Sequence, residues 1–219
     1  MEQNFINWAK GKLGSNATVS KEIYGDQNIV YRFHVSVKNY FLKIGSGLAK
    51  ERERLEWLDG KLPVPKVISF THIEDKDALL LSAIEGTNLA ELSKEWPAEK
   101  VINKLVEALH KFHSIDAKKC PFGNWDKNKV LVHGDACLPN FIFKDDLLSG
   151  YIDLGDLRVY DVSVDLSAAI WSLQYNLGKG YGLKFLGKYG VKNATEELVE
   201  KLRLQYEDTQ KIWFGDDSK

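Results

Sequence analysis

Apolar residues in the first part of the chain change from a helical to an alternating spacing. Residues 1–14 predict a short amphipathic helix. Residues 48–58 predict a second helix, with leucines on one side and the charged residues 50–53 elsewhere. Alternating or clustered β-branched and aromatic residues predict strands at 19–24, 29–35, 40–44, 67–70 and 79–83, with a tight turn at 37–39.

The second part of the chain has a mostly helical pattern. Apolar residues at helical spacing predict helices at 97–114, 164–177, 181–189 and 195–214. Before the second of these, residues 141–143 and 151–152 predict two short buried strands joined by a turn at 144–150. The order predicts an α+β protein with a β-rich N-terminal lobe, residues 1–83, and a mainly helical C-terminal lobe, residues 84–219.

Composition excludes several classes of protein. The 219 residues are 44% hydrophobic and 28% charged, enough for a substantial core, and the net charge of −1 gives no basic footprint for nucleic acid. Two cysteines without a CxxC pair indicate neither a disulfide framework nor a zinc site. The longest uncharged, mostly apolar stretch, residues 166–173, is too short to cross a bilayer. The N-terminus lacks the apolar core of a signal peptide, so we expect a cytoplasmic protein.

The candidate chemistry is concentrated in the run VLVHGDACLPNFIF, residues 130–143, and the following GYIDLGD, residues 150–156. The two strands of this region bring Asn140 and Asp153 to the same end of a hairpin, and Asp135 lies five residues before Asn140. A carboxylate that accepts a hydroxyl proton, with an amide oxygen and a second carboxylate for metal, suits phosphoryl transfer from Mg-ATP. The HGD tripeptide alone does not decide this, because Asp and Asn in turns also form local backbone hydrogen bonds.

These segments resemble the catalytic region of the aminoglycoside 3'-phosphotransferases, distant relatives of the protein kinases. The resemblance implies a protein-kinase-like two-lobe fold, with ATP and Mg²⁺ as cofactors. Carried over by residue, it makes Asp135 the catalytic base and Asn140 and Asp153 the magnesium ligands. It gives His133 and Asp165 structural roles in supporting the catalytic loop.

The N-terminal lobe offers residues for the nucleotide. Lys43 ends the third predicted strand, and the family's ExxRLxWL pattern makes Glu51 its partner, with Glu53 as the fallback. The segment LLLSAIEG resembles the family's hinge, so the Ser82 carbonyl and the Ile84 N–H are expected to meet adenine. The turn that could present backbone N–H groups to phosphates consists of Gly25, Asp26, Gln27 and Asn28, which also suit an ordinary turn.

The acceptor side departs from the family pattern. A pair of acidic helices normally follows the CPF or CPY segment, but here Cys120-Pro121-Phe122 is followed almost at once by Val130. The usual arginine after IDLG is Asp156, and the family's acidic pair aligns with Tyr175 and Asn176. The acidic candidates for an acceptor site are Asp156, Glu207 and Asp208, and the last two lie in a segment that also suits a solvated helix face.

The sequence therefore predicts an ATP-dependent kinase of a small, cationic hydroxyl acceptor, first of all a kanamycin-type aminoglycoside 3'-hydroxyl, with a link to antibiotic resistance. A kinase of another amino alcohol or sugar, and a nucleotide-binding protein without turnover, stay open. A hydrolase with His133, Asp135 and Asp153 as metal ligands is disfavoured by the pairing of Lys43 with Glu51. We expect a monomer or a weak dimer without a nucleic-acid or membrane partner.

Overall fold

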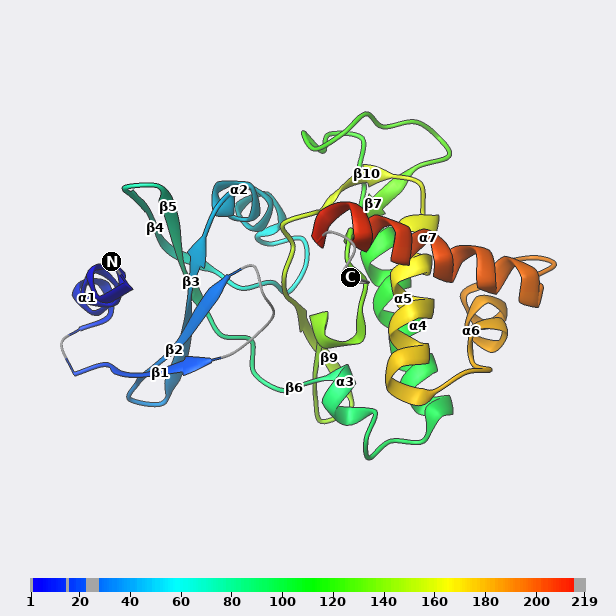
Figure 1. Cartoon of the computed structure of the whole chain (residues 1–219), viewed down its shortest axis with the longest axis horizontal. Coiled ribbons are helices and arrows are strands. Elements are labelled where there is room, and N and C mark those ends of the chain that lie inside the picture. The colour runs from blue at the N-terminus through cyan, green and yellow to red at the C-terminus, as the bar shows by residue number, and fades with distance from the viewer. Residues whose placement is uncertain (1, 15, 23–27, 215–219) are drawn as a thin grey trace. The chain divides into compact units, whose positions relative to one another are not determined.

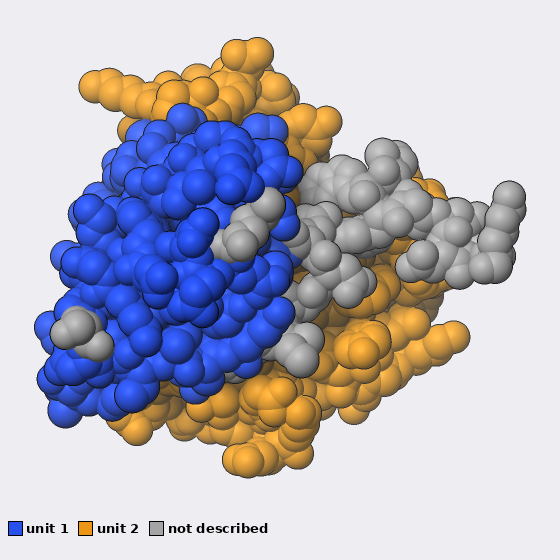
Figure 2. All heavy atoms as spheres, turned by 60° about the vertical axis from the view of Figure 1, so that its left-hand side comes forward, with its two compact units in different colours: residues 1–84 blue, residues 85–219 orange. Residues whose placement is uncertain are grey.

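The computed structural model describes residues 2–14, 16–22 and 28–214. The chain divides into two compact units, Met1–Ile84 and Glu85–Lys219 (Figure 2). The boundary predicted from the sequence lies one residue earlier, after residue 83. The first unit is a sheet with two helices and the second is mainly helical, which confirms the α+β class.

Unit 1 contains a five-stranded antiparallel sheet in the order β1-β2-β3-β5-β4. Its strands are β1 (Thr18–Glu22), β2 (Ile29–Val35), β3 (Lys38–Gly45), β4 (Val67–Ile73) and β5 (Lys76–Ser82). Its helices are α1 (Glu2–Leu13) and α2 (Leu48–Leu58), which lie on opposite sides of the sheet (Figure 1). All seven of these elements were predicted from the hydrophobic pattern.

Strand alternation distributes the side chains of β3 between the two helices. Leu42 and Ile44 belong to a core cluster with Phe5 and Ala9 of α1, and all four are nearly or fully buried. Since successive strand residues point to opposite faces, Lys43 lies on the other face, which α2 contacts. The hydrophobic pattern of β3 thereby decides which helix Lys43 can reach.

Two details of unit 1 differ from the sequence analysis. The predicted turn at 37–39 is wrong, because the turn is formed by Ser36 and Val37 and β3 begins at Lys38. Ser36 takes a positive φ of 56°, so the hairpin reverses one residue earlier than the pattern indicated. Glu51 also lies on the buried face of α2 rather than apart from the leucines, and it is 4% exposed.

Unit 2 is built from helices around two small sheets. The helices are α3 (Leu89–Leu92), α4 (Ala98–His113), η1 (Leu138–Asn140), α5 (Ser163–Leu177), α6 (Gly182–Tyr189) and α7 (Glu196–Phe214). The strands pair as β6 (Thr87–Asn88), β8 (Phe141–Lys144) and β9 (Leu147–Tyr151) in one sheet, and as β7 (Val130–Val132) with β10 (Arg158–Tyr160) in the other. The four long helices lie where the sequence predicts them, whereas β6 and β10 were not predicted.

The hairpin of β8 and β9 is tighter than expected. The predicted turn at 144–150 is wrong, because only Asp145 and Asp146 separate the strands, both with positive φ. This two-residue connection with positive φ matches the twist of a hairpin. Ile152 lies just beyond β9, and its N–H donates to the Asn140 carbonyl at 3.0 Å. Asn140, just before β8, and Asp153, just after β9, therefore lie at the same end of the hairpin.

Candidate active site

The catalytic-loop candidates Asp135 and Asn140 are bonded to each other. Nδ2 of Asn140 donates to the Asp135 carbonyl and to Asp135 Oδ2, both at 2.9 Å. Asn140 is 6% exposed at the end of η1. Ser172 of α5 steadies the same turn, because its Oγ accepts the Leu138 N–H at 2.9 Å. The amide nitrogen of Asn140 thus bonds to Asp135, and the amide oxygen Oδ1 points away from Asp135.

A buried carboxylate anchors the start of the loop. Asp165, in the first turn of α5, is 0% exposed and accepts the backbone N–H groups of His133 at 2.7 Å and Gly134 at 2.9 Å. His113 of α4 donates from Nε2 to Oδ2 of Asp165 at 2.9 Å, and its Nδ1 meets the Tyr189 hydroxyl at 2.8 Å. Three donors therefore satisfy a charge that would be costly to bury alone.

The His133 ring fills the space beneath the loop. It is 0% exposed and lies between the rings of Phe112 and Phe141, with centroid distances of 5.5 and 5.8 Å. Its Nε2 donates to the Ile152 carbonyl at 3.0 Å, and Nδ1 faces the Asp135 N–H at 3.4 Å. These contacts are structural, and they tie the loop to the end of the β8–β9 hairpin.

Gly134 is required by the close approach of the loop to the segment after β9. Its φ is 93°, and a Cβ at this position would lie 2.5 Å from the Asp156 carbonyl oxygen. Only glycine combines this backbone conformation with so short a distance. Asp153 also has a positive φ, of 60°, and its side chain is exposed just after the hairpin. The catalytic loop at Gly134 and the segment after β9 at Asp153 thus both require a residue with positive φ.

In unit 1, Lys43 and Glu51 form a close ion pair. Nζ of Lys43 lies 2.7 Å from Oε1 and 2.9 Å from Oε2 of Glu51. The two side chains are 16% and 5% exposed. Such a pair between a strand lysine and a glutamate of the following helix orients the ammonium group for phosphates in kinase-type enzymes.

Asp77 connects β5 to the beginning of α2. The helix starts after Gly47, which has a φ of 75° and no side chain to cap the helix. Oδ2 of Asp77 lies 3.4 Å from the Ala49 N–H in the first turn, and Oδ1 lies 2.8 Å from Nδ1 of His72. A carboxylate is favourable at this end of a helix. Asp77 therefore helps to hold the helix that carries Glu51.

The other residues predicted to bind the nucleotide belong to the turn before β2 and to the segment that ends unit 1. Gly25, Asp26 and Gln27 lie outside the described residues, and Asn28 is half-buried immediately before β2. Ser82 ends β5, and Ile84 is the last residue of unit 1. The fallback Glu53 is exposed and lies 3.9 Å from Arg52, so Glu51 is the glutamate that meets Lys43.

The acceptor candidates have different surroundings. Asp156 is half-buried against Gly134, whereas Glu207 forms an ion pair with Arg203 and Asp208 is exposed. Tyr175 is 77% exposed and stacks on Trp171, with ring centroids 5.4 Å apart. An aromatic surface thus occupies one of the positions at which the family pattern has an acidic pair.

Two residues that support the site were not predicted from the sequence. His113 of α4 bonds to Asp165, which holds the loop backbone, and the hydroxyl of Tyr206 lies 2.9 Å from Asp135 Oδ1. No local motif marks either residue, because each meets its partner from a helix distant in sequence.

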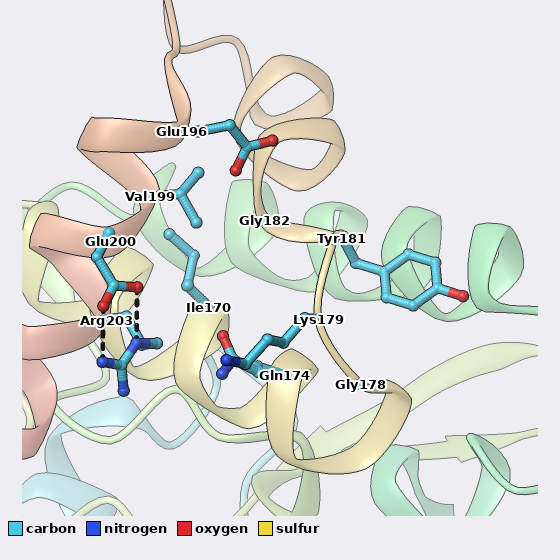
Figure 3. Close-up of a pocket in the computed structure, with 11 residues that line it drawn as sticks. Ile170, Gln174, Gly178, Lys179, Tyr181, Gly182, Glu196, Val199, Glu200 and Arg203 are labelled. Atoms are coloured by element: carbon cyan, nitrogen blue, oxygen red, sulfur yellow. Dashed lines mark hydrogen bonds and ion pairs between the residues drawn. The ribbon is translucent and has the colours of Figure 1, made fainter.

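A cavity of about 260 Å³ lies among α5, α7 and the segment 178–182 (Figure 3). Figure 3 shows Glu200 and Arg203 facing each other across one side of it, consistent with their ion pair at 2.8 Å. Asp135, Asn140 and Asp153 are not among its lining residues. The cavity is therefore separate from the predicted phosphoryl-transfer residues of unit 2.

The fold and these residues define a phosphotransferase of the kinase-like class, with a lysine–glutamate pair on a β-rich unit and an aspartate–asparagine loop on a helical one. The profile of the phosphotransferase enzyme family matches residues 24–129 and 123–202. The chain belongs to this family. The two matched segments overlap at 123–129, where the acidic helices of the family pattern are expected to be missing.

The similar proteins of known name confirm the resemblance. The chain is 28% identical to an aminoglycoside 3'-phosphotransferase of Niallia circulans, over 91% of this chain and 96% of that protein. It is 26% identical to one of Enterococcus faecalis, over 77% and 85%. The first alignment spans 257 positions, more than the 219 residues of this chain, so it contains gaps opposite residues of the relative.

Solved structures agree on the fold. A type VIII aminoglycoside 3'-phosphotransferase superposes with a TM-score of 0.74 at 21% identity, covering 94% of this chain and 98% of that one. A Streptomyces rimosus aminoglycoside phosphotransferase, solved with ADP and streptomycin, gives 0.75 at 20% identity, covering 94% and 97%. Within the described part of the chain, no helix has the length and apolar character to cross a membrane.

Proposed function

We propose that the protein transfers the γ-phosphoryl group of ATP to a hydroxyl of a small molecule, and that a kanamycin-type aminoglycoside 3'-hydroxyl is the first acceptor to test. The observation that carries the proposal is the bonded pair of Asp135 and Asn140 at the end of the β8–β9 hairpin. The names of the relatives support the choice of acceptor. Antibiotic resistance would follow if such a drug is modified.

Asp135 is proposed to orient the acceptor hydroxyl and to take its proton as the new P–O bond forms. Its carboxylate is half-buried and accepts a hydrogen bond from Asn140 on Oδ2, so the position of that oxygen is defined before an acceptor arrives. Positioning of this kind supplies much of the catalysis in phosphoryl transfer, since the protein does little covalent chemistry. The bonds of Asp165 to the loop backbone maintain that position.

Mg²⁺ fits the oxygen atoms at the hairpin end. Asn140, whose Oδ1 is turned away from Asp135, and the exposed carboxylate of Asp153 would hold the ion. Magnesium in such sites is bound by one or two protein oxygens together with phosphate oxygens and water, and it would neutralise charge on the phosphates. Among the described residues there is no cluster of three His, Cys, Asp or Glu that could hold a metal alone.

Unit 1 is proposed to bind the nucleotide. Lys43, directed by Glu51, would contact the α and β phosphates, and its two bonds to the carboxylate favour a single orientation of the ammonium group. Backbone N–H groups of residues 25–28 are proposed to cover the phosphates. The Ser82 carbonyl and the Ile84 N–H, at the end of β5 and of the unit, are proposed to meet adenine.

The acceptor is the less constrained part of the proposal. The short segment between Phe122 and Val130 and the exposed Tyr175 support a reduced acidic wall for a polycationic drug. Glu207 and Asp208 are the proposed remaining acidic contacts, together with Asp156. An amino alcohol or another sugar is therefore the second candidate class of acceptor.

The test is ADP release from Mg-ATP in the presence of kanamycin A, with ethanolamine as a simple amino alcohol. We expect kanamycin A to stimulate release and Asp135→Asn to reduce kcat by at least about 100-fold, because the general base is lost. Asp145→Asn, an exposed carboxylate in the hairpin turn, is the matched control and should leave kcat unchanged. Nucleotide binding without release for any acceptor would instead support a protein without turnover.

A further inference from the structure

The hydroxyl of Tyr206 touches the proposed base from a helix outside the catalytic segments. Tyr206 lies in α7, is 8% exposed, and has its Oη 2.9 Å from Oδ1 of Asp135. The family match ends at residue 202, so it does not account for this contact. Neither the HGD loop nor the following hairpin contains the residue.

The tyrosine ring is held in place by its neighbours. Its centroid lies 5.2 Å from that of Trp171 on α5, with an angle of 43° between the rings. The helices α5 and α7 pack against each other, and in Figure 1 α7 crosses the upper part of α5. Oη further lies 3.2 Å from Sγ of Cys137, within the loop itself. A buried ring with contacts to two elements has little freedom to move its hydroxyl.

The hydroxyl acts as a donor toward the carboxylate. Burial, together with Cys137 and Asp135, raises the pKa of Tyr206 above its usual range, so the phenol keeps its proton. Its single proton is directed to Asp135, and the thiol of Cys137 donates to the Ala168 carbonyl at 3.7 Å. Both oxygens of the Asp135 carboxylate therefore accept a hydrogen bond, Oδ1 from Tyr206 and Oδ2 from Asn140.

We propose that Tyr206 is a positioning residue for Asp135, which fixes the plane of its carboxylate and so the direction in which an acceptor hydroxyl is bound. Rotation about the last torsion of aspartate is otherwise broad. The bond from Asn140 fixes the position of Oδ2 alone, whereas the bond from Tyr206 to Oδ1 also fixes the plane of the carboxylate. Each oxygen retains a second lone pair for the acceptor. The inference rests on the proposed phosphotransferase function.

The experiment compares Tyr206→Phe with Tyr160→Phe in the full chain. The first change removes the hydroxyl and retains the ring against Trp171, and the second removes a hydroxyl from an exposed ring at the end of β10. ADP formation is measured by steady-state kinetics with kanamycin A as the acceptor and, in its absence, with water as the acceptor. We expect Tyr206→Phe to lower kcat about tenfold or more without changing KM for Mg-ATP, and Tyr160→Phe to match the parent.

A double variant tests whether Tyr206 acts through Asp135. In an Asp135→Ala background, Tyr206→Phe should have no further effect on kcat, because the group it positions is gone. An equal loss in both backgrounds would indicate a general structural role and overturn the inference. Parent-like kcat in Tyr206→Phe, or a change confined to KM, would overturn it as well.

Two further outcomes separate this inference from the proposed function. If the parent forms ADP with none of kanamycin A, ethanolamine and water, the proposed function fails, and the role of Tyr206 fails with it. If mass spectrometry after incubation with Mg-ATP finds phosphate on Tyr206, its hydroxyl is an acceptor and not a positioning group. Activity in the parent with no effect of Tyr206→Phe refutes only the present inference.

Discussion

At the scale of single residues, Asp165 holds the backbone of the catalytic loop and is not proposed to contact a substrate. Its carboxylate is fully buried, and three donors from the loop backbone and α4 surround it. Burial alone would raise its pKa, but the bonds from His113 and His133 outweigh burial and hold the pKa below its ordinary value of 3.8. The charged form is therefore part of the folded structure.

Asp165→Asn should destabilise unit 2 by about 3 kcal/mol near neutral pH, because an amide cannot accept from all three donors. Since the folded pKa is lowered, the stabilisation by Asp165 is present above the unfolded pKa and lost as the pH falls through the folded pKa. The difference between parent and variant should therefore shrink in acid. Urea unfolding from about pH 7 to about pH 3 measures it, and a difference that grows in acid would contradict the assignment.

At the scale of elements, helix α2 depends on a residue from a neighbouring strand. The residue before the helix, Gly47, has no side chain to cap it. Asp77 of β5 instead accepts the Ala49 N–H in the first turn of the helix. The same helix carries Glu51 to Lys43. A contact that stabilises the helix end therefore also affects the lysine–glutamate pair.

Asp77→Ala should lower the free energy of unfolding by about 1 kcal/mol, the usual value of a helix cap. It should also raise KM for Mg-ATP more than it lowers kcat, because the position of Glu51 becomes less defined. Asp75→Ala, at an exposed position in the β4–β5 turn, is the matched control and should leave both quantities unchanged. Equal effects of the two substitutions would show that the contact with Ala49 does not matter.

At the scale of the whole molecule, each unit has buried residues of its own. Phe5 of α1 is 0% exposed in the cluster beneath the sheet of unit 1, and Phe112 of α4 is 0% exposed beside the His133 ring of unit 2. The boundary after Ile84 separates the two sets. Local opening of one unit thus exposes a different core from opening of the other.

Phe5→Ala should cost about 3 kcal/mol, through lost burial and the cavity it leaves. Hydrogen exchange should become faster at amides of residues 1–84 while residues 85–219 keep their protection. Phe112→Ala is the reciprocal variant and should reverse that pattern. Faster exchange over the entire chain in both variants would mean that the units unfold as one.

The sequence by itself determined the order of the elements, because local spacing of apolar residues reports which face of each helix or strand is buried. It therefore predicted α2 at its observed bounds and the four long helices of unit 2. It also predicted that the strand with Lys43 is followed by the helix with Glu51. The HGD and IDLG segments also carried the chemistry, since Asp135 and Asn140 are close in sequence and Asp153 follows a short hairpin. Turn positions were less certain, as the shifts at Ser36 and Asp145 show, because single positive-φ residues decide them.

Only the tertiary structure decided what surrounds that chemistry. His113, Asp77 and Tyr206 meet their partners across 52, 28 and 71 positions of sequence, so no local pattern could reveal the contacts. The direction of a side chain toward another element depends on how complete helices and strands pack. For this protein, sequence identified the proposed base, and packing identified the residues that hold it.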